Sequence, residues 1–227
     1  MSRKKQNRLS EEKSFCIMNF VPKTKNQKIL VDLIEKKEII ISTGTSGVGK
    51  TYVALATALS LLNKGYKKIV LIKSVTTIPG EEIGFIPGNI QEKMDPFFLS
   101  YSRTIDKLCG KDTFKDLVGK GLIEILPIAY IRGLSIDDSV VILDEAQNIN
   151  NHTFKTIITR IGENSKYIFL GDIEQIDRKK EKESCLELVL NIFKQVDYIG
   201  TLEFTNDDCV RNPIIPKILE ELKFYDI

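Results

Sequence analysis

The sequence predicts a doubly wound α/β domain, in which a mainly parallel sheet carries helices on both faces. Short, almost wholly apolar segments alternate with segments of helical spacing along most of the 227 residues. Strands of that kind are typical of a parallel sheet buried on both faces, and right-handed crossovers then place helices on either side. A third observation is the glycine-rich loop at residues 44–51, which separates the first apolar run from the first long apolar helix.

The elements are expected in the following order along the chain. Residues 26–36 have helical spacing, with Leu30, Leu33 and Ile34 on one face. Residues 74–90 show no clear period and are rich in Gly and Pro, and such a long loop in a compact domain is more often functional than idle. Strands are expected at residues 38–43, 68–73, 121–126, 139–144, 166–171 and 197–204, and helices at 51–63, 90–108, 151–161, 184–194 and 213–223.

A single core is predicted for residues 23–227, with an insert at about residues 74–110 and a basic, flexible tail over residues 1–22. The composition, 42% hydrophobic and 28% charged, is that of an ordinary soluble globular protein. No apolar run reaches the roughly 20 residues that a membrane span needs. No hydrophobic segment follows the basic N-terminus, so neither membrane insertion nor a secretory signal is expected.

The four cysteines lie far apart, none of them in C-x-x-C spacing, and His152 is the single histidine. This pattern argues against a zinc site and a disulfide framework, and it favours reduced thiols in a cytoplasmic protein. The formal net charge is only +2. Any nucleic-acid site is therefore expected to be a local patch rather than a property of the whole surface.

Residues 44–51 match the phosphate-binding pattern G-x-x-x-x-G-K-[ST] in the required setting between a strand and a helix. Glycines let the backbone form a concave nest of N–H donors, and the following helix directs its positive end at the same anion. Lys50 is expected to reach the β- and γ-phosphates, and the Thr51 hydroxyl to bind Mg²⁺. The predicted nucleotide-binding residues are Gly44, Thr45, Ser46, Gly47, Val48, Gly49, Lys50 and Thr51.

Two adjacent carboxylates, Asp144 and Glu145, follow the apolar run at residues 140–143. In a fold of this kind the C-terminal end of a strand lies beside the phosphates. Asp144 is then expected to hold Mg²⁺, usually through water, and Glu145 to orient or deprotonate the attacking water. The glutamate favours hydrolysis over storage of the nucleotide. It also favours the class of ATPases that insert a strand between the P-loop strand and the Mg²⁺-binding strand.

Three further signals are weaker because each has an ordinary structural alternative. Gln175 and Asp172 follow the apolar segment at residues 166–171 and are candidates for sensing the γ-phosphate. Gln27 stands shortly before the first strand, where its amide could read the donor and acceptor edge of adenine. Arg211 is a candidate arginine finger on the transition-state charge, and the alternative is a plain surface arginine.

Several segments together resemble the PhoH family of ATPases, in the family's order and from about Asn26 to the C-terminus. The most specific are residues 80–96 and the segment Asp-Glu-Ala-Gln-Asn at 144–148. The chain resembles a compact, phage-type version, because the extra N-terminal region of cellular members has little counterpart in it. The other matching segments are residues 44–51, 127–133, 159–162, 171–177 and 210–213.

The resemblance implies a RecA-like P-loop core, related to the first motor lobe of superfamily-one helicases, with ATP and Mg²⁺ as ligands. It also implies ATP hydrolysis, association with RNA or single-stranded DNA, and ring-like homo-oligomers such as a hexamer. By the match, Gln27 falls on the adenine-reading position, Gln175 on the γ-phosphate sensor and Arg211 on the candidate finger.

One functional hypothesis is a helicase-like ATPase in which a neighbouring subunit supplies the second lobe. Arg211 or Arg160 would then reach the nucleotide of the adjacent chain across a ring-forming interface. Within the insert, Tyr101, Arg103 and the pair Phe97 and Phe98 could stack on bases or bind the polymer backbone. The two phenylalanines could equally be core residues of an amphipathic helix.

A second hypothesis is an ATP-gated regulatory binding module, in which nucleotide occupancy switches a partner surface and hydrolysis is slow. A small-molecule kinase is less well supported, since no acceptor site or lid is visible in the sequence. A GTPase is disfavoured, because Asn63-Lys64-Gly65-Tyr66 lacks the aspartate of the guanine-reading N-K-x-D pattern.

Overall fold

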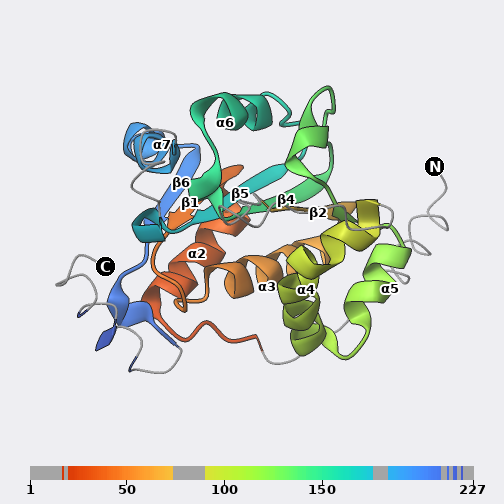
Figure 1. Cartoon of the computed structure of the whole chain (residues 1–227), viewed down its shortest axis with the longest axis horizontal. Helices are drawn as coiled ribbons and strands as arrows, with labels where there is room; N and C mark the ends of the chain where they lie inside the picture. Colours follow the sequence, from red (N-terminus) through yellow and green to blue (C-terminus); the bar gives the residue numbers. More distant parts are fainter. Residues whose placement is uncertain are drawn as a thin grey trace.

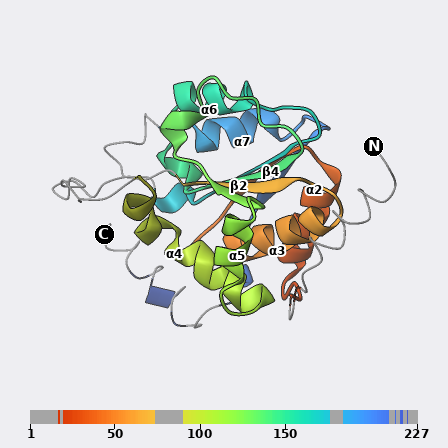
Figure 2. The same cartoon turned by 90° about the vertical axis from the view of Figure 1, so that its right-hand side faces the viewer.

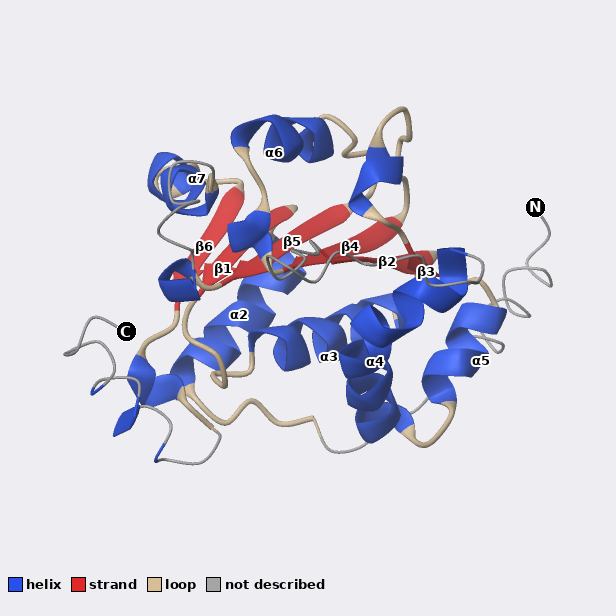
Figure 3. Cartoon of the chain, viewed as in Figure 1, coloured by secondary structure: helices blue, strands red, loops and turns tan. Residues whose placement is uncertain are grey.

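The structure is a computed structural model, and it describes Ile17, residues 20–73, 90–175 and 184–210, and Ile214, Lys217, Ile218 and Glu221. Within these residues, six strands form one wholly parallel sheet in the order β3-β2-β4-β5-β1-β6 (Figure 3), which confirms the predicted fold class. The strands are β1 (Ile39–Thr43), β2 (Lys68–Lys73), β3 (Ile123–Ile125), β4 (Ser139–Asp144), β5 (Lys166–Gly171) and β6 (Ile199–Glu203).

Strand β5 lies between β1, which leads into the P-loop, and β4, which ends in the predicted acidic pair. Ile168 of β5 is in register with Ile40 of β1 on one side and with Ile142 of β4 on the other. This is the inserted strand that the sequence predicted. Because all of these strands are parallel, their carboxyl ends share one edge of the sheet, and the polar residues that follow them meet there.

Helices cover both faces of the sheet (Figures 1 and 2). On one face lie α2 (Lys25–Lys36), α3 (Lys50–Asn63), α4 (Ile90–Cys109) and α5 (Thr113–Gly119), and on the other lie α6 (Asn151–Ile158) and α7 (Leu186–Phe193). In the parts of the chain that the structure describes, none of the helices combines the length and the apolar character that crossing a bilayer requires.

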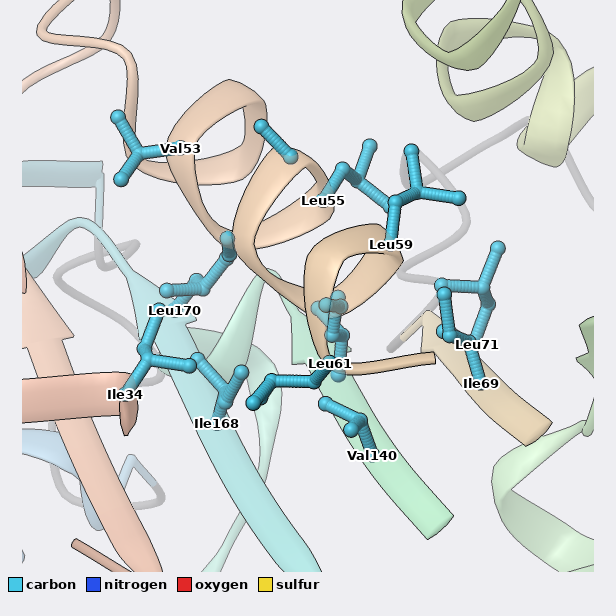
Figure 4. Close-up of a cluster of buried hydrophobic side chains, with 14 of the residues drawn as sticks. Ile34, Val53, Leu55, Leu59, Leu61, Ile69, Leu71, Val140, Ile168 and Leu170 are labelled. Atoms are coloured by element: carbon cyan, nitrogen blue, oxygen red, sulfur yellow. The ribbon is translucent and has the colours of Figure 1, made fainter. Parts of the chain in front are cut away.

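The strands alternate their side chains between two hydrophobic cores. In β4, Val140 and Ile142 face the core under α3, whereas Val141 and Leu143 face the core under α6 and α7. The same two-residue alternation runs through β2 and β5, as the period of an extended strand requires. Figure 4 shows the first core, where side chains of α3 meet those of β2, β4 and β5, with Ile34 of α2 at the margin.

The boundaries of an element agree closely with the range predicted from the sequence where one or both faces of that element are buried. Strands β2, β4 and β5 coincide with the predicted ranges, while the helix expected at 151–161 ends at Ile158. Helix α5 was not predicted from the sequence. Most of the helix expected at 213–223, residues 74–89 of the insert and most of the N-terminal tail lie outside the described residues, so these stay predictions, whereas the helix expected at 90–108 is present as α4. Of the tail, Ile17 and Phe20 pack against the core under α3.

Candidate nucleotide-binding site

The P-loop and the carboxyl ends of β4 and β5 converge on one pocket of about 630 Å³. Helices α2 and α4 complete its walls. The sequence-predicted residues that line it are Gln27, Ser46, Gly47, Gly49, Lys50, Thr51, Asp144, Glu145, Asp172 and Gln175. The structure therefore brings together the loop, the acidic pair and the sensor candidate, which come from three separate parts of the chain.

Helix α3 begins directly at the floor of the pocket. Its N-cap is Gly49, which has the left-handed backbone angle φ +90° and carries no side chain to cap the first turn. The first N–H groups of α3 are thus left to face an anion, which the helix dipole also favours. Val48 is wholly buried. Phe204 packs so closely against Gly44 that a Cβ added there would lie 2.5 Å from the Phe204 Cβ, so Val48 and Phe204 together shape the loop from beneath.

Lys50 and Thr51 stand at the mouth of the loop. The Lys50 ammonium donates to the backbone carbonyl of Gly44 and, at 3.1 Å, to that of Thr45. The Thr51 hydroxyl donates to a carboxylate oxygen of Asp144 at 3.1 Å. A hydroxyl and a carboxylate side by side are hard oxygen donors of the kind Mg²⁺ takes when phosphates and waters supply the remaining ligands, so the residues fit that ion.

Glu145 is held in an unusual backbone conformation at the tip of β4. Its φ is +58°, in the left-handed region that non-glycine residues rarely occupy, and such strain is concentrated at functional sites. The buried Gln147 donates to the Glu145 carboxylate at 2.8 Å, and its carbonyl oxygen accepts the backbone N–H of Asp172 at 3.1 Å. One amide therefore ties the tip of β4 to the tip of β5.

Asp172 and Gln175 lie where β5 ends. Burial raises the pKa of Asp172, while the charge of Lys50 acts to lower it, so this carboxyl lies within electrostatic reach of the P-loop lysine. The exposed Gln175 ends the short 3₁₀-helix Ile173–Gln175, and its backbone N–H donates to the Asp172 carbonyl at 3.3 Å. Both residues line the pocket, and their role as sensors of the γ-phosphate stays a prediction.

Gln27 packs under the P-loop rather than standing free on α2. Its amide nitrogen donates to the Val48 carbonyl at 2.8 Å, and its carbonyl oxygen accepts the Lys23 backbone N–H at 2.7 Å. These contacts use one of the two donors and one of the two acceptor positions of the amide, which leaves one of each for a ligand. The side chain thus fixes the loop, and its role in reading adenine stays a prediction.

The C-terminal side of the pocket is fastened to α2 through Asp208. This carboxylate accepts hydrogen bonds from the Asn26 amide at 2.6 Å and from the Thr205 backbone at 3.0 Å. Burial acts to raise the pKa of Asp208, but hydrogen bonds from Thr24, Thr205 and Asn26 outweigh it and hold that pKa below its ordinary value. The segment that leads to Val210, a pocket-lining residue, is fixed in this way.

Arg211 lies outside the described residues, so its predicted role as a finger stays a prediction. Arg160, the other candidate, lies in the turn after α6, where its backbone carbonyl accepts from the Tyr167 hydroxyl near the beginning of β5. The start of β5 is the sheet edge opposite to the pocket. Arg160 is therefore placed far from the nucleotide site of its own chain.

Helix α4 supplies a wall of the pocket that the sequence did not reveal. Ser100, Arg103, Thr104 and Lys107 line it. Tyr101, in contrast, is wholly buried, so the prediction that it could stack on a polymer is wrong. The side chains of Phe97 and Phe98 lie outside what the structure describes, so their role stays a prediction. Polar residues spaced by three and four along an amphipathic helix were visible in the sequence, but what that face meets depends on how α4 packs.

Gly49→Ala should weaken nucleotide binding through Gln27. An added Cβ would lie 2.8 Å from the Gln27 amide nitrogen and push that side chain off the Val48 carbonyl. The left-handed backbone alone costs roughly 1–2 kcal/mol for a non-glycine residue. Gly133→Ala is the matched control, since Gly133 has φ +83° and a Cβ there would meet nothing within 4 Å.

Both glycine variants should therefore lose the backbone contribution to the unfolding free energy in urea titrations, and Gly49→Ala should lose about 0.5–1.5 kcal/mol more for the displaced Gln27 hydrogen bond. Gly49→Ala alone should lose affinity for a fluorescent ATP analogue. Equal nucleotide affinity in the two variants would show that Gln27 does not shape the site.

Fold and site together define a RecA-like P-loop protein of the nucleoside-triphosphate-binding class. The family model for PhoH-like proteins matches residues 19–223, and the chain belongs to this family. It is 37% identical over 198 residues to the PhoH-like protein of Bacillus subtilis, covering 87% of this chain and 62% of that protein. It is 35% identical over 189 residues to the protein PhoH of Escherichia coli, covering 82% and 53% respectively.

The chain thus spans between about half and two thirds of the length of these curated relatives. Among solved structures, it is similar to the large terminase of a thermophilic bacteriophage, with a TM-score of 0.52 and 13% identity. That match covers 88% of this chain and 50% of the terminase chain. At so low an identity the likeness concerns the fold, and it agrees with the parallel sheet and P-loop described above.

Proposed function

We propose that this protein is a Mg²⁺-dependent ATPase that couples hydrolysis to binding or remodelling of RNA or single-stranded DNA. The observation that carries the proposal is the hydrogen bond between Thr51 and Asp144, with Lys50 and Glu145 lining the same pocket. A P-loop, a metal-binding carboxylate and a second carboxylate at one rim are what hydrolysis of a triphosphate requires.

Each residue then has a role that its position supports. The first N–H groups of α3 and the Lys50 ammonium bind the β- and γ-phosphates. Thr51 and Asp144 would hold Mg²⁺, which would neutralise charge on those phosphates. Glu145, oriented by Gln147, would take the proton of the attacking water, and Gln175 would sense the γ-phosphate.

Recognition of the base as adenine is assigned to Gln27. The remaining donor and acceptor of its amide match the N–H and ring nitrogen that adenine presents on its amino edge. Support comes from its burial beside the loop and its place in the pocket lining.

A homo-oligomer is part of the proposal, because one RecA-like core has no second lobe to close on its nucleotide. A ring in which each subunit meets the next head to tail would supply that lobe. Arg211, or Arg160 from the edge opposite to its own pocket, would then act on the neighbouring nucleotide. The position of Arg160 favours action between chains for that residue, since its own site is distant.

The alternative is an ATP-gated binding module, and one experiment separates the two. ATPase rates should be measured with single-stranded RNA, with single-stranded DNA, with heparin as a polyanion without bases, and with no polymer. Light scattering gives the mass alongside, against 25.8 kDa for one chain. We expect stimulation by a nucleic acid and not by heparin, in an assembly larger than one chain. Slow hydrolysis that no polymer changes would overturn the coupled ATPase in favour of the gated module.

A further inference from the structure

Helix α4 presents a polar face to the same pocket that holds the P-loop and the acidic pair. Ser100, Arg103, Thr104 and Lys107 are spaced by three, four and seven residues, which places them on one side of a helix. All four line the pocket together with Lys50, on the P-loop. With Arg103 and Lys107, this face of α4 adds two cations to the pocket wall beside Lys50, all from the same chain.

The adjoining face of α4 fixes that wall in place. Tyr101, Ile105 and Leu108 are wholly buried in the core under α3. Both Figures 1 and 2 show α4 alongside α3, the helix that carries the P-loop at its start. The Asp106 carboxylate accepts the Phe114 backbone N–H at 2.9 Å, which ties the end of α4 to α5. These contacts anchor α4 with its polar face on the pocket that the P-loop also lines.

Two interactions locate the wall close to the phosphate end of the pocket. The Lys107 ammonium lies 6.0 Å from the ring centroid of Tyr52, the residue directly after the Mg²⁺-binding Thr51. Burial raises the pKa of Tyr101, two residues before Arg103, and the charge of Asp144 raises it further, so the buried Tyr101 side chain lies within electrostatic reach of that carboxylate. Helix α4 therefore spans from the metal-binding carboxylate to the first turn of α3, and Arg103 lies on the stretch between these two interactions.

The charges in the pocket leave a role for further cations. Asp144, Glu145 and Asp172 are acidic, and apart from the α4 residues the cations that line the pocket, among the described residues, are Lys50 of the P-loop and Lys23. A triphosphate brings additional negative charge to a site that already holds three carboxyl groups. An arginine is suited to meet it, because its planar fork can donate two hydrogen bonds to one phosphate.

We propose that the α4 face is a phosphate-binding wall for the chain's own nucleotide, with Arg103 donating to the phosphate chain and Lys107 adding a second cation. This inference rests on the proposed function and assigns a nucleotide contact that acts in cis. It differs from the sequence-based hypothesis that Arg103 binds the backbone of a nucleic acid, and the two make opposite predictions.

The test compares Arg103→Gln and Lys107→Gln with Lys115→Gln, a matched loss of one exposed cation on α5 outside the pocket. Affinities for fluorescent ATP and ADP analogues are measured with Mg²⁺ in the intact chain. Loss of a charge-assisted hydrogen bond to phosphate predicts ATP binding weaker by about 10- to 100-fold for Arg103→Gln. We expect a smaller loss for Lys107→Gln, partial recovery in Arg103→Lys, and wild-type binding in Lys115→Gln. Circular dichroism and the melting temperature check that each variant folds.

Each result has a separate consequence. A loss of affinity for ATP alone supports the wall and places Arg103 at the γ-phosphate. A loss of affinity for both ATP and ADP also supports the wall and places Arg103 nearer the base. Unchanged ATP affinity, with weaker binding of a fluorescein-labelled single-stranded oligonucleotide, overturns it in favour of a polymer contact. Unchanged binding of both ligands overturns it as well. If wild-type protein binds no ATP, or Lys50→Ala binds it normally, the proposed function itself fails, independently of Arg103.

Discussion

Replacing Lys50 with alanine should abolish ATP hydrolysis while the protein remains folded. In this structure the Lys50 ammonium donates to carbonyl groups of its own loop, across the space where phosphates are expected. A cation in that position can exchange those contacts for phosphate oxygens and then follow the charge that develops during transfer. Removal of one such preorganised donor costs about 10²- to 10³-fold in turnover, and more when ATP binding is lost as well.

The stability of the Lys50→Ala variant should fall only modestly. The lysine is partly buried and donates to two backbone carbonyls, and a typical intramolecular hydrogen bond contributes about 0.5–1.5 kcal/mol to the unfolding free energy. Lys64→Ala is the matched control, because Lys64 follows the same helix at its far end and pairs with Glu35 at the surface. Steady-state phosphate release should be lost in the first variant and kept in the second. Wild-type turnover in Lys50→Ala would remove the basis for placing the active site at the P-loop.

The arrangement of the sheet was predictable because its strands are buried on both faces. Val140, Val141 and Ile142 are apolar without a break, and such a run can only be a strand covered from both sides or part of a buried helix. The short length of this apolar run and the acidic pair at its end favoured the strand over the helix. The P-loop was predictable because the phosphate nest demands glycine, lysine and threonine at fixed spacing.

The contacts between distant segments could not be predicted from the sequence. Gln147 follows Glu145 closely, yet its bond to the Asp172 backbone depends on β5 being inserted beside β4. The basic face of α4 was visible as a pattern, but the sequence could not show that Arg103 turns toward the pocket while Tyr101 turns inward. Helix α5 was missed because seven residues with one buried side chain, Leu117, carry too little periodicity.

The hydrogen bonds of Gln147 couple the side chain of Glu145 at the tip of β4 to the backbone at the tip of β5. Gln147 contacts the Glu145 carboxylate with one end of its amide and the backbone at Asp172 with the other. A Cβ on Gly171 would lie 3.0 Å from the Gln147 carbonyl oxygen, so the two tips are closely packed around this amide. In the proposed hydrolysis, movement of Glu145 when the γ-phosphate leaves would therefore shift the backbone at Asp172, and through it Gln175.

Glu145→Gln should stop hydrolysis and leave ATP bound. The glutamine side chain has the same shape, and its carbonyl oxygen can still accept the hydrogen bond from the Gln147 amide. The strained backbone at φ +58° is present in both proteins, so the side chain should keep its position. What is lost is a base and a negative charge. Removal of a general base lowers the rate by about 10²- to 10⁴-fold.

ATP affinity in Glu145→Gln should be equal to that of the wild type or higher, because one carboxylate that repels the γ-phosphate is gone. This separates the variant from Lys50→Ala, in which binding and turnover fall together. Single-turnover hydrolysis and retention of radiolabelled ATP on a desalting column measure the two quantities. Glu163→Gln, an exposed glutamate shortly before the start of β5, is the control and should behave as wild type. If Glu145→Gln releases phosphate at the normal rate, the attacking water is activated by another group, and Asp172 becomes the next carboxylate to test.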